Sequence, residues 1–157
     1  TFAKFQHSTF DNNTQRNINN EGKPLIENQN QEKYKSSSLT AEEMDTIFKA
    51  LNDLFRDKEI YLEPQLKIQT VASQLKITSH HLSQTINSKT GKPFYEFVNE
   101  FRVEKLKEFL ISPEKQHLTI LALGLECGFN SKASLNRIFK NQTGVSPSQF
   151  QKTHFIK

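Results

Sequence analysis

The chain has 157 residues, a formal net charge of +4 at pH 7 and a single cysteine. This length suits one ordinary domain with a tail and excludes two large domains. One cysteine can form neither an internal disulfide nor a cysteine-based zinc site, so a reducing compartment, by default the cytoplasm, fits best. No apolar run reaches the roughly 18 residues that cross a bilayer, and the start lacks the apolar stretch of a signal peptide. Because that start also lacks Met, we expect a piece of a longer chain.

Charge is unevenly distributed along the chain. Residues 39–64 carry three basic and seven acidic side chains, whereas residues 65–157 carry 13 basic and six acidic ones. The positive charge therefore belongs to the C-terminal part. Such a basic field is compatible with a nucleic-acid partner, although a mild excess of Lys is also common on solvated surfaces.

Residues 1–38 are rich in Asn and Gln, poor in aliphatic residues and interrupted by Gly22, Pro24 and three successive serines. This composition cannot bury a core, and it predicts a mostly disordered polar linker. The alternative is an expression-tag remnant, but His7 is isolated and no tag pattern accompanies it.

Order is predicted to begin at Thr40, because Thr40 and Glu43 have the spacing of a capping box at a helix start. Apolar residues then recur at spacings of three and four from Met44 to Phe55, which predicts an amphipathic helix of four to five turns. Its acidic outer face is expected to be solvated, with a dimer contact as the alternative. Residues 60–64 break this helix, and a further helical stretch is predicted from Leu66 to Leu75.

An internal repeat emerges when the chain is compared with itself at an offset of about 53 residues. Leu82-x-x-x-Ile86-x-x-x-Thr90-Gly91 aligns with Leu135-x-x-x-Phe139-x-x-x-Thr143-Gly144, and Phe97 aligns with Phe150. Each copy is predicted to hold a short helix (69–75 or 120–127), a tight connection and a second helix capped by Thr78 or Ser131. Gly128 permits a positive φ at the end of its short helix, whereas the first copy has Lys76 there. The pattern predicts two helix-turn-helix units.

The second helix of each unit carries polar side chains on the face opposite the core. A helical wheel with Leu82, Thr85 and Ile86 toward the core leaves outward and flanking positions for side chains that could read DNA bases. These candidates are His80, Ser83, Gln84 and Asn87 in the first copy and Lys132, Ala133, Asn136 and Arg137 in the second. An Arg guanidinium can bind guanine O6 and N7, and Gln or Asn amides can bind adenine. Any amphipathic helix exposes polar residues, but two such helices at repeat spacing favour DNA readout.

Three motifs of the second copy resemble the AraC/XylS family of transcription regulators, and the resemblance covers about residues 45–153. The motifs are Gly128-Phe129-Asn130-Ser131, Leu135-Asn-Arg-Ile-Phe139-Lys140 and Thr143-Gly144-Val-Ser146-Pro147-Ser148-Gln-Phe150. The resemblance implies an all-α DNA-binding domain of about seven helices over residues 39–157. In it, two helix-turn-helix subdomains (66–91 and 119–144) are joined by a long helix (94–110) and followed by a terminal helix (147–153). Both second helices would enter successive major-groove segments of one duplex.

The family's base-reading positions fall on the candidates named above, apart from Asn87. Its phosphate contacts come from helix N-termini and nearby polar or basic side chains, which here implies Thr78, Ser131, Lys140, Ser146 and Gln149. The chain departs from the family at Gly124, where Ala is usual, and at Gln151, where Arg often follows the aromatic residue. Gly124 is expected to weaken its helix by up to about 1 kcal/mol relative to Ala. Gln151 replaces a side chain expected to contact the DNA backbone.

The implied partner is double-stranded DNA, and no cofactor or metal is expected. His80 and His81 lack accompanying metal ligands, and Cys127 is expected to be a small core residue. The family also implies contact with RNA polymerase, dimerisation through an upstream region or helix 40–56, and a membrane-anchored or larger sensor whose cytoplasmic output is this domain. The second unit, with Lys132 and Arg137, is expected to anchor the DNA electrostatically while the first refines sequence choice. The alternatives are an α-helical protein-interaction module and, more remotely, an enzyme, for which no catalytic constellation is found.

Overall fold

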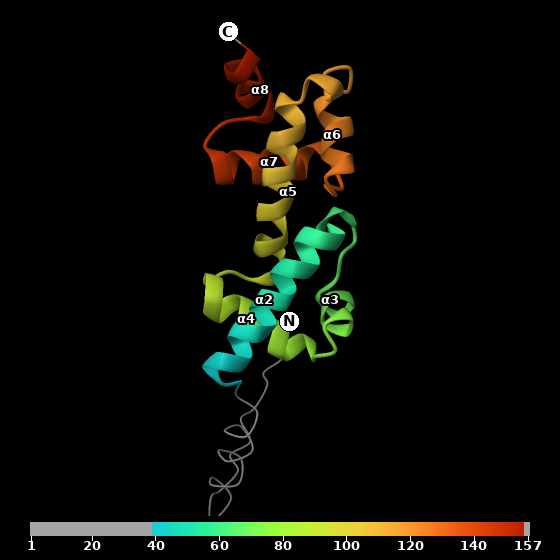
Figure 1. Ribbon diagram of the computed structural model, residues 1–157. Helices are drawn as coiled ribbons and strands as arrows, with labels where there is room; N and C mark the ends of the chain where they lie inside the picture. Colours follow the sequence, from blue (N-terminus) through green and yellow to red (C-terminus); the bar gives the residue numbers. More distant parts are fainter. Residues whose placement is uncertain (1–38, 156–157) are drawn as a thin grey trace, which may run out of the picture. The chain divides into compact units, whose positions relative to one another are not determined.

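The computed structural model describes residues 39–155, so the interpretation of residues 1–38 as a polar linker lies outside the described residues. Within the described part the secondary structure is entirely helical, in agreement with the all-α expectation (Figure 1). The seven α-helices are α2 (Ala41–Lys58), α3 (Ile68–Gln74), α4 (Ser79–Thr90), α5 (Phe94–Ile111), α6 (Ile120–Glu126), α7 (Lys132–Thr143) and α8 (Pro147–Phe155). Two short 3-10 helices are η1 (Ile60–Leu62) and η2 (Pro113–Lys115). No helix in this part of the chain is long and apolar enough to cross a membrane.

Helix α2 begins with the capping box that the sequence predicts. The amide of Thr40 donates to Glu43 Oε2 (2.8 Å), and the amide of Glu43 donates to Thr40 Oγ1 (3.2 Å). The apolar stripe of the helix faces inward, since Leu51 and Phe55 are fully buried. The helix ends at Glu59, whose φ of 46° turns the chain into η1. The apolar stripe of α2 therefore packs inside this domain.

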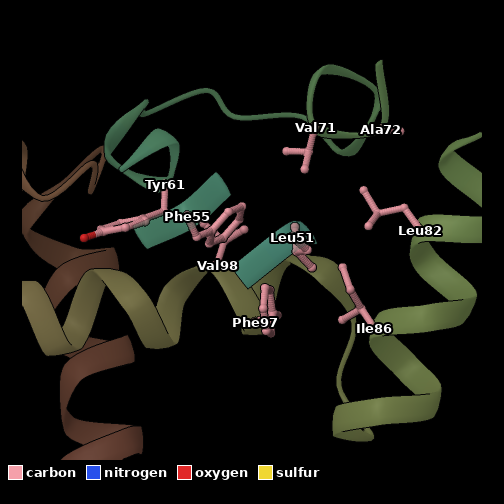
Figure 2. Close-up of a cluster of buried hydrophobic side chains, with 9 residues drawn as sticks. All are labelled: Leu51, Phe55, Tyr61, Val71, Ala72, Leu82, Ile86, Phe97 and Val98. Carbon is pink, nitrogen blue, oxygen red and sulfur yellow. The ribbon is translucent and has the colours of Figure 1, made fainter. Parts of the chain in front are cut away.

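The first of two hydrophobic cores lies between α2, α3, α4 and the N-terminal half of α5. Its buried side chains converge from these helices and from η1, as Figure 2 shows. They are Leu51, Phe55, Tyr61, Val71, Ala72, Leu82, Ile86, Phe97 and Val98. The ring of Phe55 lies 5.5 Å from that of Phe97 and 5.0 Å from that of Phe101, between ring centroids. These ring contacts join α2 to α5, and the other buried side chains pack the helix pair α3–α4 against them.

The second core lies between the C-terminal half of α5, α6, α7 and the start of α8. Its buried members are Val103, Leu106, Leu110, Leu123, Cys127, Phe129, Leu135, Ile138 and Phe139. Phe150 of α8 closes it, with its ring 5.6 Å from that of Phe139. Burial raises the pKa of the Cys127 thiol to about 12, and this side chain is fully buried. Cys127 is thus a core residue, as predicted.

Helix α5 belongs to both cores. Phe97 and Val98 point into the first, whereas Val103, Leu106 and Leu110 point into the second. In Figure 1, α5 accordingly runs from the group formed by α2, α3 and α4 to the group formed by α6, α7 and α8. At its C-terminal end, Gln151 of α8 donates from Nε2 to the carbonyl of Leu110 (3.4 Å). The position at which the sequence departs from the family therefore helps to fasten α8 to α5.

Candidate nucleic-acid interface

The short helix of each predicted unit ends in the same hydrogen-bonded turn. In the first unit, Ile77 N donates to Ala72 O (3.0 Å) and Lys76 N donates to Ser73 O (3.1 Å). In the second unit, the amides of Phe129 and Gly128 donate in the same way to carbonyls of α6, at 3.0 Å each. This pair of bonds defines a Schellman motif, which requires a left-handed residue just after the helix. Gly128 fills that position with φ 85°, whereas Lys76 adopts φ 57° despite its side chain.

The two turns differ by one residue. The hydrogen-bonded residues of the first turn are matched 52 positions later, but the helix caps Thr78 and Ser131 are 53 positions apart. The second connection is therefore one residue longer, and Asn130 is the residue immediately before its cap. Asn130 is exposed and donates from Nδ2 to the carbonyl of Pro64 (3.1 Å), a residue between η1 and α3.

Helices α4 and α7 begin at the predicted caps. Thr78 Oγ1 accepts a hydrogen bond from His81 N (3.1 Å), and Ser131 Oγ accepts one from Ser134 N (3.2 Å). Both caps satisfy an amide that a helix start leaves without a partner. Each second helix is 12 residues long, and its N-terminus directly follows the turn. The two predicted helix-turn-helix units are therefore present.

The structure leaves most base-reading candidates accessible. Exposed candidates are His80, Ser83, Asn87, Lys132, Ala133 and Arg137, whereas Asn136 and Gln84 are half-buried. Gln84 differs from its outward place on the wheel, because its Oε1 is buried and has no hydrogen-bond partner among the described residues. A long side chain can fold back over the protein surface, so its angle on a wheel does not fix its exposure. Thr85 and Ile86 are fully buried, as expected.

Most of the phosphate-contact candidates already form hydrogen bonds within the protein as helix caps. Besides the caps Thr78 and Ser131, the amide of Ser146 donates to Gln149 Oε1 (2.9 Å), and the amide of Gln149 donates to Ser146 Oγ (3.2 Å). This reciprocal pair is a capping box at the start of α8. Lys140, by contrast, is exposed and has no ion-pair partner within residues 39–155. Its ammonium group is therefore available to an external anion.

Helices α4 and α7 differ from the other long helices in charge. Neither contains Asp or Glu, whereas α2 contains five acidic residues and α5 contains four. In the described part of the chain, none of the three cations of α7 (Lys132, Arg137 and Lys140) is in an ion pair, whereas half of the twelve other Lys and Arg side chains are paired. A surface that faces phosphate should lack carboxylates and carry unpaired cations. Both second helices meet the first condition, and α7 also meets the second.

The surroundings of Arg137 include residues that the sequence does not single out. Arg137 lines a depression that also contains Tyr95 and Asn99 of α5. Tyr95 is 55% exposed, and Asn99 is buried with its Oδ1 unpaired among the described residues. A scan of the second helices alone misses them because they lie on the connecting helix. An exposed aromatic ring just after the Pro93 helix start is the one signal that could have found Tyr95.

Gly124 has a packing role that its helix propensity does not reveal. A Cβ at this position would lie 1.7 Å from Leu135 Cδ1, and Leu135 is only 1% exposed. The glycine therefore lets α6 and α7 approach closely around Leu135.

Two capped helix-turn-helix units, joined by a helix shared between their cores, define a bipartite DNA-binding protein. A family model described as a helix-turn-helix domain matches residues 71–153. The chain belongs to this AraC-type helix-turn-helix family of DNA-binding transcription regulators.

Individual relatives agree with this assignment. The probable transcription factor PqrA of Proteus vulgaris is 29% identical over 103 residues, which are 64% of this chain and 82% of that protein. The C-terminal domain of AraT, a response regulator from Geobacillus stearothermophilus, superposes with a TM-score of 0.59 at 26% identity, covering 71% of this chain and 87% of that one. The DNA-binding domain of AdpA, solved in complex with a target DNA, shares the fold with a TM-score of 0.56 at 20% identity, covering 71% of this chain and 91% of that one. Three other curated regulators are matched over only 32%, 12% and 30% of their own length.

Proposed function

We propose that this chain is the DNA-reading part of a transcription regulator and binds specific duplex sequences with α4 and α7 in successive major-groove segments. The observation that carries the proposal is the pair of capped, carboxylate-free helices in repeated units. Their accessible amide, imidazole, hydroxyl and guanidinium groups match the donors and acceptors of base edges. The cations of α7 supply attraction to phosphate that does not depend on sequence.

The proposal extends to the setting in which the domain acts. It assigns binding rather than catalysis, a cytoplasmic location, and regulation, as an activator, through contact with RNA polymerase. We further propose that a sensor portion, in some settings membrane-anchored, precedes the domain and controls it. Because the apolar stripe of α2 is buried in the first core, a homodimer would use the upstream region or the polar outer face of α2.

The test separates base reading from phosphate attraction. Selection from a random pool first yields the preferred duplex. Arg137→Ala is then expected to weaken binding to that duplex by about 1 to 3 kcal/mol and to relax preference at one base pair. Lys140→Ala is expected to weaken binding to the selected and to random duplexes by similar factors, because an ammonium on phosphate reads no base. Fluorescence anisotropy at several salt concentrations measures both effects.

Lys49→Ala provides a matched control, since Lys49 is an exposed cation of α2 without an ion pair in the described residues. It is expected to leave both affinities unchanged. Equal losses of Arg137→Ala on selected and random DNA would remove Arg137 from the base-reading set. Failure of the wild-type protein to bind any duplex, even at low salt, would refute the proposal and favour a protein-interaction module.

A further inference from the structure

The first unit, taken together with α2 and residues 59–64, which pack on the same core, touches the second unit at a junction beside α5. Arg102 lies at the centre of this junction. Arg102 is only 4% exposed. Its Nε donates to the carbonyl of Tyr61 and its Nη2 donates to the carbonyl of Glu63, at 2.7 Å each. Burial lowers the pKa of this guanidinium. Burying a cation costs free energy, and both acceptors of Arg102 are neutral carbonyls. We therefore look for the role of Arg102 in the positioning of the segments it joins and not in added stability.

The turn of the second unit approaches the same segment, residues 61–64. A Cβ at Gly128 would lie 2.8 Å from Leu62 O, 2.9 Å from Tyr61 O and 3.0 Å from Arg102 Nε. Two residues later, the side chain of Asn130 reaches the carbonyl of Pro64. Residues 61–64 of the first unit are therefore contacted both by α5 and by the turn that leads into α7.

The residue that lengthens the second turn takes part in this junction. Only the second connection has a residue between the Schellman motif and the cap of the next helix, and that residue is Asn130. The first connection passes directly from Ile77 to Thr78. The one residue by which the two copies differ in length, Asn130, thus lies where the copies meet.

A third tie lies further along α5. Lys105 Nζ contacts Glu59 Oε1 at 2.6 Å, and this hydrogen bond lowers the pKa of Glu59. Lys105 precedes Leu106 of the second core, whereas Glu59 ends α2 of the first unit. Two units joined only by one shared helix could bend and twist relative to each other. The contacts that residues 59–64 make beside α5 oppose both motions.

We infer that the junction of Arg102, Gly128 and Asn130 with residues 61–64 fixes α4 relative to α7 and so sets the half-site spacing that the protein accepts. The inference rests on the proposed function, in which both helices read one duplex. One inserted base pair moves a half-site by about 3.4 Å and rotates it by about 35°. A rigid pair of helices cannot follow such a shift, whereas a loosened pair can. Arg102 is on this basis a positioning residue that contacts no DNA.

The first measurement requires no DNA. Pulsed electron spin resonance measures the distance between nitroxides at Ser88→Cys on α4 and Asn141→Cys on α7, both exposed positions. The native Cys127 is fully buried with a pKa of about 12, so it should not compete for the label. Arg102→Met keeps much of the side-chain volume and removes both hydrogen bonds. It is expected to broaden the distance distribution, whereas Lys107→Met, which removes only an ion pair with Glu104 of the same helix, is expected to leave it unchanged.

The second measurement compares the selected duplex with one carrying a single inserted base pair between the half-sites. The wild-type protein is expected to prefer the native spacing by about tenfold or more, and Arg102→Met to lower this preference below about threefold. Asn130→Ala, at an exposed position with one hydrogen bond, is expected to change both readouts in the same direction by less. It decides the matter if Arg102→Met does not fold. A folded junction variant with the wild-type distance distribution and the wild-type spacing preference would overturn the inference. A wild-type protein that prefers no duplex sequence would refute the proposed function, and the distance measurement alone would then test whether the junction fixes α4 relative to α7.

Discussion

Gly128 occupies a position where backbone conformation and available space both exclude a side chain. Its φ is 85°, and an added Cβ would lie within 3.0 Å of two carbonyl oxygens and a guanidinium nitrogen. Gly128→Ala is therefore expected to lower the free energy of unfolding by about 2 to 4 kcal/mol, from left-handed strain and overpacking combined. Gly144→Ala is the matched control, because Gly144 has φ 80° with no atom within 4 Å of an added Cβ.

The control is expected to cost only about 1 kcal/mol, which is the strain alone. Urea denaturation of both variants measures the difference. If the two substitutions cost the same, then the close approach of the turn to residues 61–64 contributes nothing to stability, and Gly128 serves the Schellman motif only.

Local signals account for the residues that the sequence predicts well. The caps Thr78 and Ser131 and the left-handed turn at Gly128 depend on neighbours within a few positions, so spacing alone reveals them. Arg102 depends on carbonyls 39 and 41 residues away, and no local pattern identifies those partners. A signal does exist, since Arg102 interrupts the row of apolar residues at spacing four that runs from Val98 to Leu110. The burial of Gln84 Oε1 has no such signal.

At the level of elements, helix starts in this fold serve both stability and the candidate interface. Ser131 caps α7 and was expected from the family resemblance to contact phosphate. Ser131→Asp separates these roles, because Asp caps a helix as well as Ser and suits the positive end of the helix dipole. Thermal stability is therefore expected to be retained within about 0.5 kcal/mol. Affinity for any duplex is expected to fall about tenfold or more, because the new carboxylate would face phosphate.

Thr40→Asp is the control for this substitution, since Thr40 caps α2, whose first turn already carries the carboxylates of Glu42 and Glu43. It is expected to keep both stability and DNA affinity. Calorimetry and anisotropy measure the two properties. Equal DNA affinities for Ser131→Asp and Thr40→Asp would place the N-terminus of α7 away from the phosphate backbone.

The order of helices could be predicted because each element carries its own signals, whereas their mutual placement could not. Apolar spacing and caps define α2, α4, α5 and α7 within a few residues of the observed ends. The tie between α8 and α5 through Gln151, and the use of Ser146 and Gln149 in a capping box, depend on which polar groups find partners after packing. Several candidates for DNA contact are consequently also structural residues, and stability must be measured beside affinity for each variant.

For the whole molecule, the distribution of charge between the units predicts how much each contributes to phosphate attraction and to base reading. The unpaired cations of α7 are Lys132, Arg137 and Lys140, whereas α4 has one Lys, and Lys89 is paired with Asp45 at 2.5 Å. Replacing the three α7 cations by Gln is expected to reduce the slope of log affinity against log salt by about 2 to 3, because each phosphate contact releases about 0.9 counterion. Ser83→Ala combined with Gln84→Ala is expected to leave that slope unchanged and to alter the selected motif within one half-site. Since the salt slope reports the charge that neutralises phosphate and the selected motif reports base contacts, the pair of experiments tests whether α7 supplies most of the anchoring while α4 refines sequence choice. An unchanged motif in the Ser83 and Gln84 variant, or an unchanged slope in the α7 variant, would contradict this division of labour.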